Sequence, residues 1–186
     1  MLLFVGLGNP TPDSENNRHN VGFKIIDSIN KKFGLTKQKP KFKGLLTTGN
    51  IDSKKVYAIK PLTFMNNSGI CIRELLEYFK IESENVIVFH DDLDVEFGKI
   101  KAKFGGSSAG HNGISSIDKF IGKDYSRVRI GIGKPKGPIE VSDYVLQNFD
   151  DEEIMGVEKI SKNITESLSI LVEKKLDLFS STVNNK

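Results

Sequence analysis

Short apolar runs alternate with helix-like patterns along most of the chain, and this alternation limits the possible folds more than any other feature. The apolar runs have the length of strands, and between them apolar residues recur every three or four positions, as in a helix with one buried face. This pattern predicts an α/β fold in which a mixed, twisted, mostly parallel sheet is flanked by helices on both faces. The expected strands are 2–7, 44–49, 56–59, 86–89, 99–104 and 128–132, and the expected helices begin near 21, 67, 112 and 157.

The length and composition indicate one ordinary globular domain. A chain of 186 residues with 38% hydrophobic and 27% charged residues can bury a core, which excludes a disordered chain. No linker or repeat divides it, so we predict one domain over 1–178 and a polar C-terminal tail over 179–186. The single cysteine, Cys71, excludes an internal disulfide and a cysteine-rich zinc site. No apolar stretch approaches the ~20 residues of a membrane span, and 1–10 resembles a buried strand more than a signal peptide, so we expect a cytoplasmic protein.

The charges are unevenly distributed around a net charge of +3. Residues 31–60 contain nine Lys and one acid, residues 82–98 contain six acids and no base, and residues 99–136 contain nine bases and two acids. If the two basic segments meet in space, they would form a face for a polyanion. Charge counts alone favour an ordinary solvated, lysine-rich surface.

Three histidines are the candidate proton acceptors, and each precedes an amide or carboxylate residue. A neutral imidazole can take a proton near pH 7, and a carboxylate can hold its tautomer. Asn9 and the pair His90-Asp91 directly follow expected strands, so they should meet at the carboxyl edge of a parallel sheet. Any one histidine alone could instead cap a helix or lie on the surface. The three pairs are His19-Asn20, His90-Asp91 and His111-Asn112.

Arginine is rare among the 27 basic residues, which suggests that a planar, bidentate donor is needed where it occurs. Arg127 and Arg129 alternate along one expected strand and therefore share a face. Ordinary surface pairing explains arginines about as well. The four arginines are Arg18, Arg73, Arg127 and Arg129.

Two other chemistries are possible from the residues alone. Residues 106–110 match the G-x-S-x-G pattern of a serine nucleophile, but the only later histidine, His111, is too close in sequence to reach Ser108 easily. Asp91, Asp92 and Asp94 could bind Mg²⁺ or Mn²⁺ in a metal-dependent phosphohydrolase. No second carboxylate cluster follows a strand, which counts against that alternative.

Taken together, six motifs resemble the bacterial peptidyl-tRNA hydrolase family. They occur in the family's order and extend to about residue 175. The motifs are Gly6-Leu7-Gly8-Asn9-Pro10, Arg18-His19-Asn20-Val21-Gly22, residues 60–69 (KPLTFMNNSG), His90-Asp91-Asp92-Leu93-Asp94, residues 105–113 (GGSSAGHNG) and residues 127–133 (RVRIGIG).

The resemblance implies an enzyme that cleaves the ester between a peptide and the 3′ end of tRNA, so that the tRNA can be reused. It implies that His19 is the general base, that Asp91 holds and polarises it, and that Asn9 helps to distinguish peptidyl-tRNA from unblocked aminoacyl-tRNA. It also implies a monomer that needs no metal or other cofactor and whose partner is tRNA. The substrate-lining positions would be Phe64, Met65, Asn66 and Asn112, and the clamp for the tRNA 5′-phosphate would be Lys103 and Arg129.

One stretch departs from the family pattern. Ser14 stands where the family usually has a Tyr that stacks in the site, and Asn17 replaces the usual Thr before Arg18-His19. We therefore do not transfer the aromatic contact to this chain. The departure leaves open a third class, a tRNA-binding module that has lost the chemistry, although an intact His19 and Asp91 argue against it.

Overall fold

The computed structural model describes residues 1–186, which form a seven-stranded sheet in the order β2-β3-β4-β1-β5-β7-β6. The strands are β1 (Leu2–Gly6), β2 (Lys39–Lys41), β3 (Gly44–Ile51), β4 (Lys54–Pro61), β5 (Val86–Asp92), β6 (Ile100–Phe104) and β7 (Ser126–Gly131). The helices are α1 (Val21–Phe33), α2 (Ser68–Phe79), α3 (Asn112–Ile121), α4 (Val141–Val145), α5 (Asp151–Glu166), α6 (Leu168–Val172) and α7 (Leu176–Asn184). Short 3₁₀ turns are η1 (Pro12–Ser14), η2 (Arg18–Asn20), η3 (Met65–Asn67) and η4 (Ser83–Asn85).

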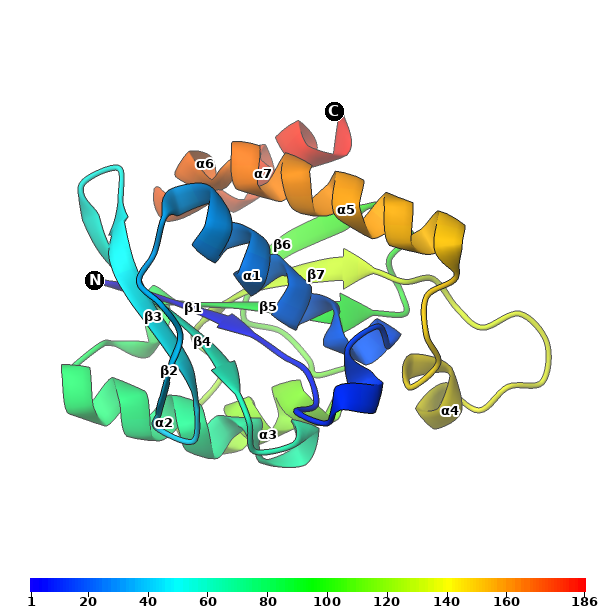
Figure 1. Ribbon diagram of the computed structural model, residues 1–186, viewed down its shortest axis with the longest axis horizontal. Helices are drawn as coiled ribbons and strands as arrows, with labels where there is room; N and C mark the ends of the chain where they lie inside the picture. Colours follow the sequence, from blue (N-terminus) through cyan, green and yellow to red (C-terminus); the bar gives the residue numbers. More distant parts are fainter.

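The centre of the sheet is parallel and its margins are antiparallel. β1 pairs in parallel with β4 and β5, and β5 pairs in parallel with β7. β2, β3 and β6 run antiparallel to their neighbours. The predicted α/β class, with a mixed sheet and helices on both faces, is confirmed (Figure 1).

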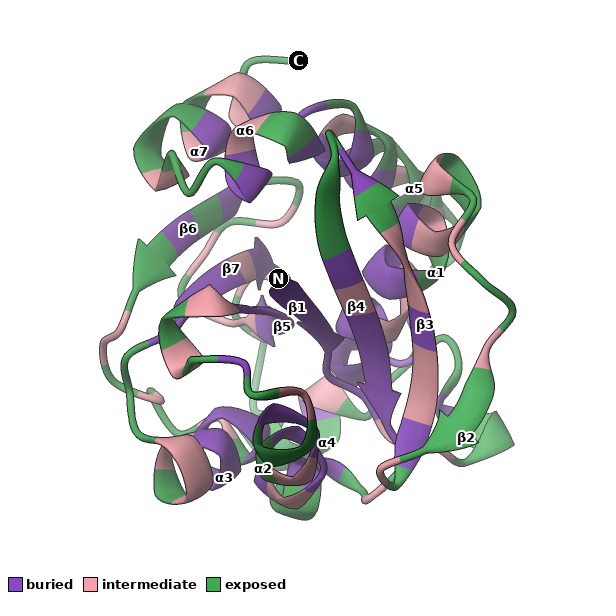
Figure 2. Ribbon diagram, turned by 90° about the vertical axis from the view of Figure 1, so that its left-hand side faces the viewer, coloured by how far each residue is buried: buried purple, intermediate pink, exposed green.

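Alternation along the central strands divides the core into two layers. In β1, Phe4 packs into the layer beneath α1 and α5, whereas Leu3 and Val5 pack into the layer that contains residues of α2 and α3. All five residues of β1 are buried because helices cover both faces of the strand. This explains why β1 is a continuous apolar run in the sequence. The buried strands and the helices that cover them are seen in Figure 2.

A close backbone contact brings the start of α1 onto the sheet. A Cβ atom on Gly6 would lie 2.2 Å from the carbonyl oxygen of Gly22, and one on Gly22 would lie 2.4 Å from that of Phe89. Only glycine permits this approach. It sets η2, directly before α1, against the carboxyl end of β5.

The C-terminal region differs from the prediction. Residues 179–186 were predicted to be a polar tail, but α7 contains most of them, with Phe179 and Val183 buried in the core. Phe179 and Val183, four positions apart, share one face of the helix and dock it onto the core, with Leu176 packed partly buried beside them. The single long final helix expected from Val157 to Leu171 also divides at Ser167 into α5 and α6.

α7 also covers one edge of the sheet. The Ser180 hydroxyl accepts a hydrogen bond from the Ala102 backbone N–H at 2.8 Å. The Asn184 side chain accepts from the Ile100 N–H at 2.9 Å and donates to the Ile100 carbonyl at 2.8 Å. Side chains of α7 thus take the place of an eighth strand. No helix is long and apolar enough to cross a membrane.

Candidate active site

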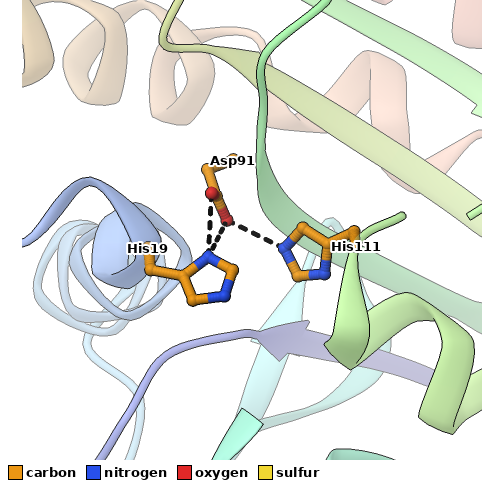
Figure 3. A group of neighbouring side chains, drawn as sticks. All are labelled: His19, Asp91 and His111. Carbon is orange, nitrogen blue, oxygen red and sulfur yellow. Dashed lines mark hydrogen bonds and ion pairs between the residues drawn. The ribbon is translucent and has the colours of Figure 1, made fainter. Parts of the chain in front are cut away.

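An imidazole and a carboxylate meet where the parallel strands end, although they are far apart in sequence. His19 lies on η2, and Asp91 lies near the end of β5. Nδ1 of His19 is 2.9 Å from Oδ2 and 3.0 Å from Oδ1 of Asp91 (Figure 3). Asp91 is 2% exposed, so the contact is shielded from water.

A second imidazole reaches the same carboxylate. Nε2 of His111 is 2.9 Å from Oδ1 of Asp91, and the His19 and His111 rings lie 4.8 Å apart between centroids. His111 is the N-cap of α3, and its Nδ1 accepts from the backbone N–H groups of Gly113 and Ile114 at 3.1 and 3.3 Å. His111 was one of three candidate proton acceptors in the sequence, but the resemblance gave a site role to its neighbour Asn112 and none to His111. The available signal was a histidine at the start of an expected helix.

The hydrogen bonds determine the tautomers of both rings. Since Nδ1 of His111 accepts two N–H groups, its hydrogen is on Nε2 and is donated to Asp91. Since Asp91 is an acceptor, His19 donates its Nδ1–H, which leaves the Nε2 lone pair free. We assign the tautomers in this way from the network. His19 therefore has the protonation pattern of a proton acceptor.

Electrostatics keep the carboxylate ionised and the histidine behind it neutral. Burial acts to raise the pKa of Asp91, but the His111 and His19 imidazoles and their hydrogen bonds outweigh it and hold that pKa well below the usual range. Burial, reinforced by His111, lowers the pKa of His90 to about 3. The His90 Nδ1–H donates to the Asp91 backbone carbonyl at 2.8 Å, and Nε2 has no partner.

Two adjoining cavities, of about 270 and 420 Å³, share the His19 ring. The smaller cavity contains Asp91 and His111, and the larger contains Asn9 and Ser14. Ser14 is buried, and its hydroxyl is 2.6 Å from that of Thr11. Both cavities are closed on one side by α4, a helix that no sequence pattern predicted. The residues common to both are His19, Asn112, Ser142 and Val145.

Four of the predicted substrate residues lie along the larger cavity with Asn9. Oδ1 of Asn9 accepts the Met65 backbone N–H at 2.9 Å, so the side-chain amide has a fixed direction. The Asn9 backbone also exchanges two 2.9 Å hydrogen bonds with the Asn20 side chain. Phe64 is 55% exposed and has a φ of 60° and a ψ of 157°, which is strained for any residue except glycine. The four residues are Phe64, Met65, Asn66 and Asn112.

Lys103 and Arg129 lie on one face of the sheet but outside the two cavities. Lys101 pairs with Arg129 and Lys103 with Arg127, so Lys103 and Arg129 are diagonal neighbours. Nε of Arg129 is 2.8 Å from Asp92, and the side chain is 21% exposed.

The basic segments do not meet. Residues 31–60 include β2, β3 and β4, whereas 99–136 include β6 and β7 at the other end of the strand order. The two segments therefore do not form the single polyanion face considered from charge counts. Only the segment 99–136 contributes to the surface that contains Lys103 and Arg129.

The other arginines near the site are structural. Arg127 is 2% exposed; it donates to Asp118 at 2.9 Å and to the Ser107 carbonyl at 2.8 Å. Arg18, next to His19, donates to Glu153 of α5 at 3.0 Å and lies 4.2 Å from the Tyr144 ring centroid. Through Ser107 and Tyr144, these contacts hold the loop of residues 105–110 and helix α4 next to the site.

The alternative chemistries find less support. Ser108 lies in the smaller cavity, but its hydroxyl makes no hydrogen bond to a histidine; the only hydrogen bond between Ser108 and a histidine is from the His111 backbone N–H to the Ser108 carbonyl, at 2.9 Å. The three carboxylates do not converge, because Asp92 accepts from Arg129 while Asp94 lies 3.7 Å from Lys134. His19, Asp91 and His111 have ligand atoms within 4.8 Å of one another. However, a metal on His111 Nε2 would require a hydrogen on Nδ1, where two helix N–H groups already point.

The α/β fold, with a histidine–aspartate pair at the carboxyl ends of its parallel strands, has the arrangement typical of enzymes. A family model described as peptidyl-tRNA hydrolase matches residues 3–186. The chain therefore belongs to the peptidyl-tRNA hydrolase family, and it is a hydrolase.

Individual relatives agree with this assignment. A peptidyl-tRNA hydrolase from Pelagibacter ubique (strain HTCC1062) is 79% identical over 186 residues, 100% of both chains. One from Bacillus subtilis (strain 168) is 46% identical over 160 residues, 86% of this chain and 85% of that protein. A crystal structure of peptidyl-tRNA hydrolase from Acinetobacter baumannii superposes with a TM-score of 0.92 at 33% identity, covering 99% of this chain and 94% of that chain.

Proposed function

We propose that this protein hydrolyses the ester bond between the peptide and the 3′ end of peptidyl-tRNA, with His19 as the general base. The observation that carries the proposal is the contact of 2.9 Å between His19 and the buried Asp91, which leaves Nε2 of His19 free beside the cleft. Family membership supplies the substrate class.

In the proposed reaction His19 accepts one proton and later returns it. Nε2 of His19 takes a proton from water as the water oxygen attacks the ester carbonyl carbon. The imidazolium is stabilised by the Asp91 carboxylate, which stays ionised. When the tetrahedral intermediate collapses, the bond to the ribose oxygen breaks and His19 returns the proton to that oxygen. The products are a peptide with a free carboxyl group and a tRNA with a free hydroxyl.

Among the nearby amides, Asn9 is the best candidate to stabilise the developing oxyanion. Its Oδ1 is held by the Met65 N–H, so its Nδ2–H₂ group is oriented before substrate binds. Asn66 and Asn112 line the same cavity without side-chain hydrogen bonds, so they would have to be ordered by the substrate.

The tRNA body would contact the face that contains Lys103 and Arg129, which we assign to the 5′-phosphate. Charge and shape suit a protein that must accept many tRNA sequences. We further propose that the protein acts as a monomer in the cytoplasm, without a metal or cofactor. Sedimentation with and without tRNA tests the oligomeric state.

The variant His19→Asn tests the mechanism. We expect hydrolysis of an N-acetylaminoacyl-tRNA to fall by about 10²–10⁴-fold, because the proton acceptor is lost, while tRNA binding stays close to the parental value. Both proteins are assayed with EDTA. Parental turnover by the variant would reject His19 as the base, and loss of parental turnover with EDTA would favour the metal alternative. A parental protein that binds tRNA but never cleaves the ester would be a binding module.

A further inference from the structure

The Asp91 carboxylate is shared by two imidazoles that differ in what else they contact. His19 has a free nitrogen beside the cleft, whereas both nitrogens of His111 are used, one by Asp91 and one by the start of α3. The His111 side chain is 9% exposed. The mechanism proposed above gives this second imidazole no task.

His111 is held as a neutral donor. A hydrogen on its Nδ1 would oppose the N–H groups of Gly113 and Ile114 and the positive end of the α3 dipole. The titratable groups around it are Asp91, Asp92 and His90 from β5, His19 from η2 and Asp94 from the following loop. Asp92 is neutralised by Arg129 of β7, and His90 is neutral. Asp91 is thus the one uncompensated anion that His111 contacts.

We propose that His111 is a positioning residue that fixes the Asp91 carboxylate and takes up part of its negative charge, so that His19 stays neutral and able to accept a proton near neutral pH. The proposal rests on the function proposed above. A carboxylate with no other donor would stabilise a protonated His19 more strongly. His19 would then be protonated, and unable to act as a base, over a wider pH range.

Helix capping alone does not require a histidine. Asn is among the preferred N-cap residues, and its side-chain oxygen could accept the same N–H groups. It is too short, however, to reach Asp91. Gln has the complementary property, because its amide nitrogen can occupy the place of Nε2 while the cap is lost. These two residues separate the two contacts of His111.

The experiment compares His111→Asn with His111→Gln in two measurements. The first is the pH titration of the His19 ring by NMR in the protein without substrate, and the second is the pH profile of kcat/KM on N-acetylaminoacyl-tRNA. In His111→Asn we expect the His19 midpoint and the acid limb to move up by about one pH unit, the scale of one lost hydrogen bond to a charged group. In His111→Gln both should stay near the parental values, even if the protein melts earlier.

Three results would overturn the proposal. A parental midpoint in His111→Asn would show that the Asp91 contact does not tune His19. Equal upward shifts in both variants would assign the effect to loss of the imidazole ring and not of its Asp91 contact. A shift in His111→Gln alone would assign it to the α3 cap. If the midpoint moves as expected but the parent does not cleave the ester, the inference about His111 stands and the proposed function fails.

Discussion

Replacing His90 with Phe should make folding less sensitive to acid. His90 is fully buried behind the site, and burial lowers its pKa from 6.5 to about 3. Below pH 6.5 the unfolded chain therefore binds a proton at His90, whereas the folded chain does not. Stability is consequently lost as the pH falls from about 6.5 toward 3. Each pH unit in this window corresponds to about 1.4 kcal/mol, so lowering the pH from 7 to 5 costs the parent about 2 kcal/mol through this group.

Urea unfolding of His90→Phe and the parent at pH 7 and pH 5 measures the effect. The free energy of unfolding should fall by about 2 kcal/mol less in the variant than in the parent between pH 7 and pH 5, whatever the variant's stability at pH 7. Phe89→Leu is the control, because it changes a buried residue on the same strand without removing a titrating group. It should change the free energy of unfolding by the same amount at pH 7 and at pH 5. Asp91 does not interfere, because its lowered pKa removes stability only below about pH 4. If His90→Phe loses as much free energy of unfolding between pH 7 and pH 5 as the parent does, the reasoning is refuted.

Further substitutions test the surface that contains Lys103 and Arg129 and the strained backbone at Phe64. Lys103→Ala and Arg129→Ala should raise KM and reduce the slope of log affinity against log salt by about 1 each, because a phosphate contact is lost. Lys55→Ala on β4, which β1 and β5 separate from β7, should leave the slope unchanged. Equal slopes in all three variants would remove the clamp assignment. Phe64→Gly should be about 1 kcal/mol more stable than Phe64→Ala in thermal unfolding, because glycine tolerates the strained backbone. Both variants should bind the blocked aminoacyl-tRNA more weakly than the parent. Equal stability of the two variants would show that the strain is relieved elsewhere.

Much of the fold could be predicted because local patterns agree with the tertiary structure. The helix from Val21 to Phe33 has a four-residue apolar period and ends at Gly34 in the left-handed conformation, so both its face and its end are visible in the sequence. The meeting of His19 and Asp91 was predicted from the resemblance, whereas strand-end placement predicted only that Asn9 and Asp91 would lie at the same edge of the sheet. Their geometry agrees with that prediction, while their catalytic roles remain a proposal.

The elements that were missed lack a local signal. α4 is five residues long, and it is held by tertiary contacts such as Arg18 against Tyr144. The role of His111 depends on Asp91, twenty residues earlier, and a helix start alone does not reveal such a partner. The two basic segments are similar in composition, yet strand order places them at opposite ends of the sheet.

The two outer strands of the sheet are protected by different means. At β2 the residues Lys39, Pro40 and Lys41 are exposed, and charge and a missing N–H make that strand a poor template for another chain. At β6 the protection is supplied by Ser180 and Asn184 from the end of the polypeptide. Removing residues 180–186 would therefore expose the N–H groups of Ile100 and Ala102 and the Ile100 carbonyl, so α7 also helps to keep neighbouring molecules from joining sheet to sheet.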